Sequence, residues 1–206
     1  MEYRLFQRGT VPHVSTFEFH EHRERAPHLE QPTHGDRLRM TSERVLAILY
    51  QNPNYTVSDL GCGDGGMLQL IRESAPESVD AWGYDFSPAN ADGWIERNVA
   101  GELLDVFQGE SLNPKADLGN VVVVTEVLEH LESPHEILKR LFGHKSVQYI
   151  VCSSPYIETL RMHDPCHAWA WDLAGYNRLV SGAGFDVIQQ DTIDRIFQVL
   201  VGWKVD

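Results

Sequence analysis

The stretch that decides the fold is Asp59-Leu60-Gly61-Cys62-Gly63-Asp64-Gly65-Gly66. A short apolar run precedes it, and apolar positions at helical spacing follow from Met67 to Ile71, so the glycines lie where a strand turns into a helix. Glycine is favoured in such a turn because it adopts backbone angles closed to other residues and lets a ligand approach the main chain. Asp85 lies nineteen residues after Gly66, at the end of the next predicted strand. A carboxylate there can accept both hydroxyls of a ribose, so the pattern predicts a nucleoside site.

Strand and helix patterns alternate on both sides of this loop. A helical pattern runs from Asp36 to about Tyr50, and Val121 to Thr125 is a β-branched run typical of a strand buried on both faces. The last two predicted strands, near 185–188 and 196–203, are joined by a short connection, which predicts an antiparallel pair at the sheet edge. The alternation predicts an α/β domain with a mostly parallel sheet and helices on both faces.

The composition changes near residue 35, and we expect an N-terminal arm over residues 1–35 and one domain over 36–206. The arm is rich in proline and holds five of the ten histidines: His13, His20, His22, His28 and His34. Two interpretations stay open for it. It is either a solvated segment packed against the domain or a lid that covers a substrate.

Length and charge restrict the function. A chain of 206 residues fits one domain with an arm. With 30 acidic and 17 basic residues, the net charge is -13, which repels phosphate backbones and anionic membranes and argues against non-specific nucleic-acid binding. Three cysteines without metal-type spacing, no secretory signal and no membrane-length apolar run predict a cytoplasmic protein with no membrane partner.

A dehydrogenase is the first alternative, because Gly61, Gly63 and Gly66 satisfy the dinucleotide fingerprint G-x-G-x-x-G. Asp59 lies two positions before the first glycine, where an acid suits a ligand with an ammonium group better than a pyrophosphate. No second domain remains for a hydride acceptor. The sequence therefore favours a nucleoside with an ammonium group.

Three motifs together resemble the class I S-adenosylmethionine-dependent methyltransferases: Asp59 to Gly65, Gly83-Tyr84-Asp85-Phe86-Ser87-Pro88, and Glu126-Val127-Leu128-Glu129-His130-Leu131. The resemblance covers residues 36–206. It implies a Rossmann-like, doubly wound sheet of seven strands in the order 3-2-1-4-5-7-6, with strand 7 antiparallel, and S-adenosylmethionine as the cofactor. The resemblance implies that the glycine loop holds the methionine part of the cofactor and that Asp85 binds the ribose hydroxyls. It also implies that Glu102 and Leu103, after the third strand, flank the adenine. The cofactor-binding residues that it implies are Asp59, Gly61, Cys62, Gly63, Gly65, Asp85, Phe86, Glu102, Leu103 and Glu126.

The candidate catalytic residues follow the fourth predicted strand. Glu126, Glu129 and His130 have the spacing i, i+3, i+4, which predicts one face of a helical turn. Methyl transfer is an in-line displacement, so the protein supplies alignment and removes a proton where the acceptor carries one. We expect His130 to be the general base, with His167 as the second choice. Glu126 and Glu129 are expected to orient the base. The acceptor is expected to be a small molecule.

Two alternatives concern this same group. Small-RNA 3′-terminal 2′-O-methyltransferases carry a similar Glu-x-x-Glu-His element as metal ligands, followed by a later histidine. This resemblance implies a divalent metal at Glu126, Glu129 and His130, with His167 or His163 as a possible fourth ligand, and the 3′ end of a small RNA as the acceptor. The other alternative is a module that binds S-adenosylmethionine without catalysis. The sequence does not predict the oligomeric state.

Overall fold

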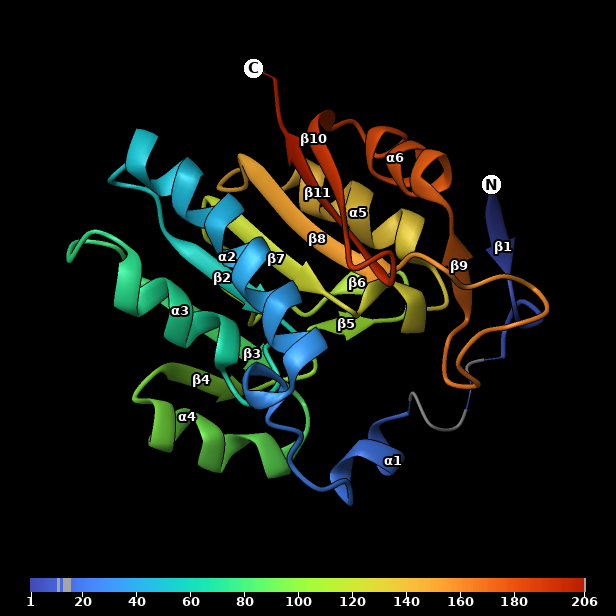
Figure 1. Cartoon of the computed structure of the whole chain (residues 1–206), viewed down its shortest axis with the longest axis horizontal. Coiled ribbons are helices and arrows are strands. Elements are labelled where there is room, and N and C mark those ends of the chain that lie inside the picture. The colour runs from blue at the N-terminus through green and yellow to red at the C-terminus, as the bar shows by residue number, and fades with distance from the viewer. Residues whose placement is uncertain (11, 13–15, 206) are drawn as a thin grey trace.

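The centre of the computed structural model is a seven-stranded sheet (Figure 1). The structure describes residues 1–10, 12 and 16–205, so the expectation for His13 lies outside the described residues. In chain order the strands of this sheet are β2 (Val57–Leu60), β3 (Ala81–Asp85), β4 (Ala100–Leu103), β7 (Val121–Thr125), β8 (Tyr149–Pro155), β10 (Asp186–Ile193) and β11 (Phe197–Trp203).

The sheet has the predicted topology. Its order is β10-β11-β8-β7-β2-β3-β4, which is 3-2-1-4-5-7-6 when these strands are numbered along the chain. β11 is antiparallel to both β8 and β10, and the other pairings are parallel. The class of fold and the antiparallel edge are therefore confirmed.

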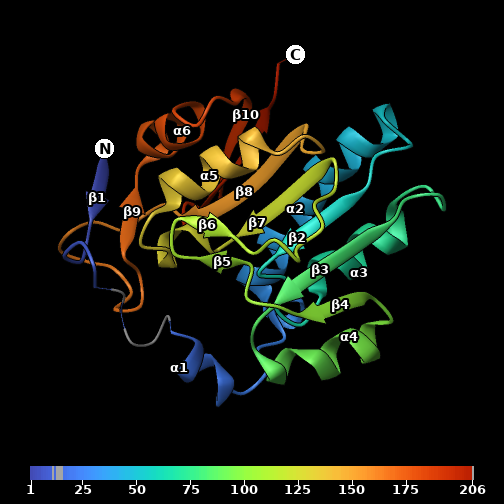
Figure 2. The same ribbon diagram turned by 180° about the vertical axis from the view of Figure 1, so that it is seen from behind.

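Helices cover both faces of the sheet (Figures 1 and 2). They are α2 (Pro32–Gln51) and α3 (Gly66–Ser74) on one face, α5 (Pro134–Gly143) and α6 (Leu173–Ser181) on the other, and α4 (Ala91–Arg97) beside β4. Val121 and Val123 of β7 pack in the core below α2 and α3, whereas Val122 and Val124 pack in the core below α5 and α6. This alternation explains why the strand is apolar at every position.

The helix before the glycine loop begins at Pro32, four residues before the predicted start at Asp36. Proline is tolerated in the first turn of a helix because its missing N–H would have no partner there. The helical pattern of apolar residues starts later, at Leu38. His34 therefore belongs to α2 and is held by a regular helix.

The arm crosses the carboxyl end of the sheet. Its first strand, β1 (Glu2–Arg4), pairs antiparallel with β9 (Trp169–Trp171), and Trp171 Nε1 donates a hydrogen bond to Glu2 at 2.9 Å. In Figure 1 the chain then passes α1 (Phe17–Glu21) before it reaches α2. The arm also contains the 3-10 helix His28–Glu30. The remaining elements are the 3-10 helices Pro88–Asn90 and Leu128–His130 and the hairpin of β5 (Phe107–Gln108) and β6 (Ser111–Leu112).

Candidate functional site

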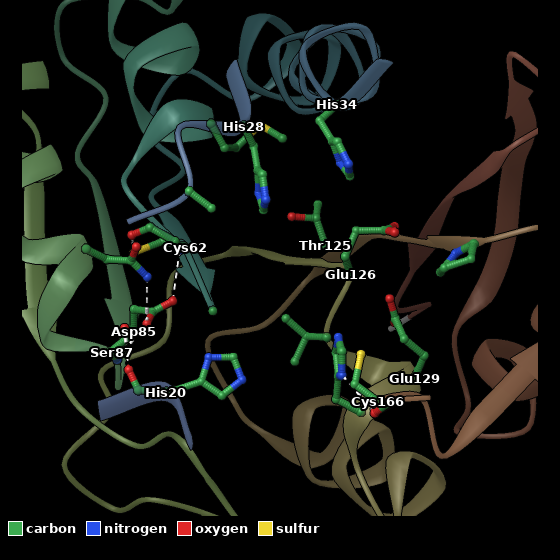
Figure 3. Close-up of a pocket in the computed structure, with 18 of the residues that line it drawn as sticks. His20, His28, His34, Cys62, Asp85, Ser87, Thr125, Glu126, Glu129 and Cys166 are labelled. Atoms are coloured by element: carbon green, nitrogen blue, oxygen red, sulfur yellow. Dashed lines mark hydrogen bonds between the residues drawn. The ribbon is translucent and has the colours of Figure 1, made fainter. Parts of the chain in front are cut away.

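A cavity of about 770 Å³ lies at the carboxyl ends of the central strands. This is the edge where open parallel sheets bind ligands. Its wall combines the glycine loop, the end of β3, the turn after β7, the loop after β8 and part of the arm. Figure 3 shows His28, His34, Asp85, Glu126 and Glu129 facing this shared space.

The glycine loop has the backbone that its sequence predicts. Gly61, Gly63 and Gly65 have φ angles of +82°, +55° and +86°, in the left-handed region that favours glycine. A Cβ atom at Gly61 would lie 2.6 Å from Cγ2 of Val127. The loop therefore needs glycine both for its turn and for its contact with the segment after β7.

Asp59 is buried at the end of β2 and lines the cavity. Its Oδ1 has no hydrogen-bond partner among the described residues. Burial, and secondly the charge of Asp85, raise the pKa of Asp59 to about 7. Because a buried polar atom without a partner is costly, this oxygen fits a donor on a ligand, such as the ammonium group predicted from the sequence.

Asp85 joins two of the sequence motifs. Its Oδ2 accepts a hydrogen bond from Gly63 N at 2.9 Å, and its Oδ1 accepts from Ser87 N at 2.8 Å and Asn90 Nδ2 at 3.1 Å. An ionised carboxylate offers about four acceptor positions, so these bonds leave room for a further donor. Cys62 and Phe86 also line the cavity, and burial raises the pKa of the Cys62 thiol.

The two residues expected beside the adenine lie elsewhere. Glu102 and Leu103 are exposed on β4 and do not belong to the cavity lining, whereas Leu104 and Asp105 do. β4 ends at Leu103, and a hydrogen bond from Leu104 N to Asp85 O (2.9 Å) turns the chain toward the cavity. The cavity wall therefore begins directly after β4, two residues further along the chain than the sequence suggested.

The turn after β7 differs from the predicted helical turn. Glu126 has a left-handed φ of +54°, and a short 3-10 helix follows over Leu128–His130. Glu126 therefore lies outside the helical turn that holds Glu129 and His130, and the expectation that all three share one face of a helical turn is wrong. The three side chains nevertheless line the same cavity.

Of the two glutamates of this turn, Glu129 is buried and Glu126 is half-buried. Glu126 Oε1 accepts a hydrogen bond from Ser153 Oγ at 2.9 Å, and burial raises the pKa of Glu126. Neither carboxylate oxygen of Glu129 has a hydrogen-bond partner among the described residues. Burial and the neighbouring Glu126 raise the pKa of Glu129 well above its usual value. Its surroundings therefore favour the protonated form of Glu129 in the absence of a bound cation.

His130 and His167 come together as the sequence suggested. Their ring centroids lie 4.7 Å apart with the rings edge to face, and one ligand atom each from His130, Cys166 and His167 lie within 4.8 Å of one another. Burial, and then His167, lower the pKa of His130 to about 3. The alternative ligand His163 lines the cavity, but it is not part of this group of three.

Glu158 and Arg37 belong to the site but carry no signal in the sequence. His167 Nδ1 lies 2.7 Å from Glu158 Oε2, a contact set by the path of the loop after β8. Arg37 of α2 is buried in the cavity wall, although arginine on a helix usually faces solvent. His20, His28 and His34 of the predicted arm and helix line the cavity as well, and burial and Arg37 lower the pKa of His28 to about 4. The histidine count drew attention to these residues but assigned them no role.

The comparisons with known proteins agree with this arrangement. Residues 33–190 match the model of a methyltransferase-domain family. A search of the curated proteins finds no matching relative. Three solved structures illustrate the structural similarity. A methyltransferase from Aquifex aeolicus that depends on S-adenosylmethionine has a TM-score of 0.64 at 14% identity, with 86% of this chain and 97% of that chain covered.

The second structure is a chain of the complex between the Haloferax volcanii Trm112 methyltransferase activator and a methyltransferase, with a TM-score of 0.61 at 20% identity and coverage of 83% and 92%. The third is magnesium protoporphyrin IX methyltransferase from Synechocystis PCC 6803 with bound S-adenosylmethionine, with a TM-score of 0.60 at 15% identity and coverage of 90% and 88%. At these identities the structures show the fold.

The family model covers more than half of the chain, so the chain belongs to the methyltransferase-domain family. With its sheet order and glycine loop, it is a class I S-adenosylmethionine-dependent methyltransferase. Among the described residues no helix has the length and apolar character needed to cross a bilayer.

Proposed function

We propose that this enzyme transfers a methyl group from S-adenosylmethionine to a hydroxyl group of a small molecule bound in the same cavity. The observation that carries the proposal is the imidazole of His167, which is held by Glu158 beside the turn after β7. The bound cofactor supplies an electrophilic methyl group on a sulfonium. The residues of this chain hold and align the partners and receive the acceptor's proton.

The cofactor would lie along the glycine loop. Asp59 has a buried acceptor for its ammonium group, and Asp85 keeps acceptor capacity for a ribose hydroxyl. Leu104 and Asp105 line the cavity beyond Asp85, and we assign the adenine to them in place of Glu102 and Leu103. A cavity of about 770 Å³ lies within the usual range for small-molecule sites.

His167 is a better general base than His130. Nδ1 of His167 donates to the carboxylate of Glu158, which leaves Nε2 as the proton acceptor and stabilises the imidazolium that forms. His130 is half-buried, and loss of solvation together with the neighbouring His167 lowers its pKa to about 3, so it binds a proton poorly near neutral pH. We therefore assign proton removal to His167 and a packing role beside it to His130.

We assign the acceptor to the space between this base and the arm. His20 and His28 of the arm line the wall of the cavity, and Ser87 Oγ donates to His20 O at 3.0 Å. An arm that closes over the cavity suits a small acceptor better than a long polymer. The net charge of -13 also disfavours a polyanion.

The test is methyl transfer from S-adenosylmethionine with an isotope-labelled methyl group to a panel of small phenols, catechols and sugar alcohols, with total small RNA as a parallel acceptor. We expect label in the small-molecule fraction and S-adenosylhomocysteine in equal amount. Label that appears only in RNA would reject the small-molecule acceptor. A protein that binds no S-adenosylmethionine in calorimetry would reject the whole proposal.

A second candidate is metal-dependent 2′-O-methylation at the 3′ end of a small RNA. The observation that favours it is Glu129, whose two buried oxygens lack a hydrogen-bond partner among the described residues. Glu126, Glu129, His130 and His167 line one cavity and offer oxygen and nitrogen donors of the kind that Mn²⁺ accepts. The ligand atoms that already lie within 4.8 Å of one another belong to His130, Cys166 and His167, so the two glutamates would have to move toward the ion. A divalent ion would supply charge stabilisation for the attacking oxygen. Glu158 would then orient a ligand, as carboxylates beside metal-bound histidines do.

Removal of divalent ions separates the two candidates. The metal enzyme loses activity in a chelator and regains it with Mn²⁺, and it prefers RNA with a free 3′-terminal 2′-hydroxyl. Activity that is untouched by the chelator would remove the second candidate.

A further inference from the structure

Two imidazoles and a thiol meet in one part of the cavity wall. They belong to His130, Cys166 and His167, and one ligand atom from each residue lies within 4.8 Å of the other two. Cys166 comes from the loop after β8 and faces the same space as Glu129 (Figure 3). His167 is buried, whereas His130 and Cys166 are half-buried. An ion in the cavity can therefore reach this group, and its nitrogen and sulfur donors are those typical of zinc sites.

The backbone holds the three residues together. Ala168 N donates to Glu129 O at 2.7 Å, one residue away from each histidine, so the loop after β8 is tied to the turn after β7 at this point. Asp164 fixes the other two positions, because its Oδ1 accepts from Cys166 N at 2.9 Å and its main-chain O accepts from His167 N at 3.1 Å. The group is therefore assembled by contacts of the protein itself.

Both imidazoles are also oriented. Nδ1 of His167 lies 2.7 Å from Glu158 Oε2, and Oε1 of the same glutamate accepts from Asp164 N at 2.7 Å. Nδ1 of His130 lies 3.3 Å from the main-chain O of Cys166. When Nδ1 donates in both contacts, Nε2 is the nitrogen that can bind an ion. Histidines that bind metals usually donate their other N–H to a carboxylate or a backbone carbonyl in this way.

We propose that His130, Cys166 and His167 bind a zinc ion, with the fourth coordination position open to the cavity. In tetrahedral zinc sites the Zn–N and Zn–S bonds are about 2.0–2.1 and 2.3 Å, so neighbouring ligand atoms lie roughly 3.3–3.6 Å apart. Small rotations of the side chains bring the present separations, all within 4.8 Å, to these values.

Binding removes one proton from the site. Burial, and then Asp164, raise the pKa of the Cys166 thiol, so the thiol keeps its proton until the ion arrives. The S–H bond then breaks, the sulfur binds zinc as a thiolate, and the proton goes to solvent. The thiolate also separates this site from the manganese site of the second candidate, because thiolates favour zinc and carboxylates favour manganese.

Zinc at this site opposes the proposed reaction. The ion takes the lone pair of His167 Nε2, which the proposed function uses to receive the proton of the acceptor. Zinc therefore inhibits methyl transfer. This consequence rests on the proposed function, whereas the binding of zinc does not.

Cobalt spectroscopy tests the site without a measurement of activity. Co²⁺ replaces Zn²⁺ in tetrahedral sites, and a thiolate ligand adds a charge-transfer band in the near ultraviolet. The wild-type protein, treated with a chelator and then dialysed, should bind one Co²⁺ per chain with this band, and one equivalent of Zn²⁺ should abolish it. A wild-type protein without the thiolate band overturns the proposal, and this result needs no variant to fold.

Variants locate the ion. Cys166→Ser should abolish the band and weaken Zn²⁺ binding by more than about 100-fold, and Glu158→Gln should keep the band and weaken it by about 10- to 100-fold, the usual effect of losing an orienting carboxylate. The controls are Cys62→Ser, which removes the other thiol of the cavity lining, and His163→Gln, which removes a histidine outside the group of three. Both should bind Zn²⁺ as the wild type does. A Cys166→Ser protein with wild-type zinc affinity overturns the site.

Inhibition separates the zinc site from the proposed function. Zn²⁺ should inhibit methyl transfer by the wild type, and Cys166→Ser should need more zinc for the same inhibition, by the factor with which its zinc affinity falls. If zinc binds with the thiolate band and turnover is unchanged, the site stands and His167 is not the base. A protein that shows the band but transfers no methyl group in zinc-free buffer overturns the proposed function alone.

Discussion

His167 Nδ1 lies 2.7 Å from Glu158 Oε2, and both side chains are 11% exposed. The two residues are nine positions apart in the loop between β8 and β9. A short hydrogen bond at this depth fixes both the tautomer and the orientation of the imidazole. The loop after β8 therefore presents one defined nitrogen to the cavity, close to the turn that carries Glu126 and Glu129.

The first prediction concerns this pair. His167→Gln should lower kcat by roughly 10²- to 10⁴-fold, the usual contribution of a general base, and Glu158→Gln by roughly 10- to 100-fold, because the imidazole loses its orienting carboxylate. Cofactor affinity should change little in both variants. Steady-state kinetics and calorimetry measure the two effects separately. His163→Gln, in the same loop, is the control, and a Glu158→Gln enzyme with full turnover would contradict the pairing.

The second prediction is a dependence of stability on pH that comes from Asp59. Its pKa is about 7 in the folded protein and about 3.9 in an unfolded chain. Between these values the unfolded chain releases the proton and the folded protein keeps it, so the unfolding free energy falls as pH rises and levels off above pH 7. Asp59→Asn removes the carboxyl group and with it this fall in the unfolding free energy. The variant should be more stable than the wild type by roughly 2–4 kcal/mol at pH 8 and nearly equal to it at pH 4.

Urea unfolding at the two pH values measures this difference. Asp36→Asn, which removes an exposed carboxylate of α2 paired with Arg39, serves as the control and should shift stability by less than about 1 kcal/mol. If Asp59→Asn raised the unfolding free energy by the same amount at pH 4 and pH 8, burial would not raise the pKa of the Asp59 carboxyl.

The sheet follows from local patterns in the sequence. The strand Val121 to Thr125 has to be covered on both faces because four valines in a row put apolar side chains on each face. The short connection before Phe197 forces an antiparallel edge. The turn from Gly61 to Gly65 needs left-handed backbone. Each of these features depends on neighbours along the chain, which a sequence records directly.

The parts of the site that the sequence did not predict depend on how loops and strand ends are arranged in space. Glu158 meets His167 through the path of the loop after β8, in which a bridge joins Thr159 and Met162. The choice of Leu104 over Glu102 depends on where β4 ends. Arg37 lies on a helix whose pattern gives no sign that a charge faces inward. Neither the role of the arm nor the cytoplasmic location is tested by the fold, and both stay predictions.

The third prediction concerns the connection between the arm and the glycine loop. Asp64 is 3% exposed and accepts hydrogen bonds from Arg97 Nε and Nη2 at 3.1 and 2.6 Å and from Arg25 Nε at 3.2 Å. Asp64→Ala leaves the buried guanidinium of Arg97 without this partner, so it should lower the unfolding free energy by roughly 3 kcal/mol. It should also free the arm for trypsin cleavage at Arg25.

The matched control is Glu96→Ala. Glu96 also pairs with Arg25 but is 66% exposed, and an exposed pair contributes less than about 1 kcal/mol. Chemical unfolding and timed proteolysis follow both variants. If Asp64→Ala and Glu96→Ala lowered the unfolding free energy equally and were cleaved at the same rate, the buried position of Asp64 would not be what holds the arm in place.

The last prediction uses Glu129 to separate the two acceptor candidates. Burial and Glu126 hold the pKa of Glu129 well above its usual range, so the protonated form of this side chain is favoured when no cation is bound. Glutamine has nearly the same shape and is also neutral. Glu129→Gln should therefore stay within about 1 kcal/mol of the wild-type stability and keep methyl transfer to a small-molecule acceptor. A metal ligand, in contrast, has to ionise to bind. If Mn²⁺ raises the Tm of the wild type and not of Glu129→Gln, and the variant loses activity, then the carboxylate binds a cation and the metal-dependent candidate replaces the small-molecule one.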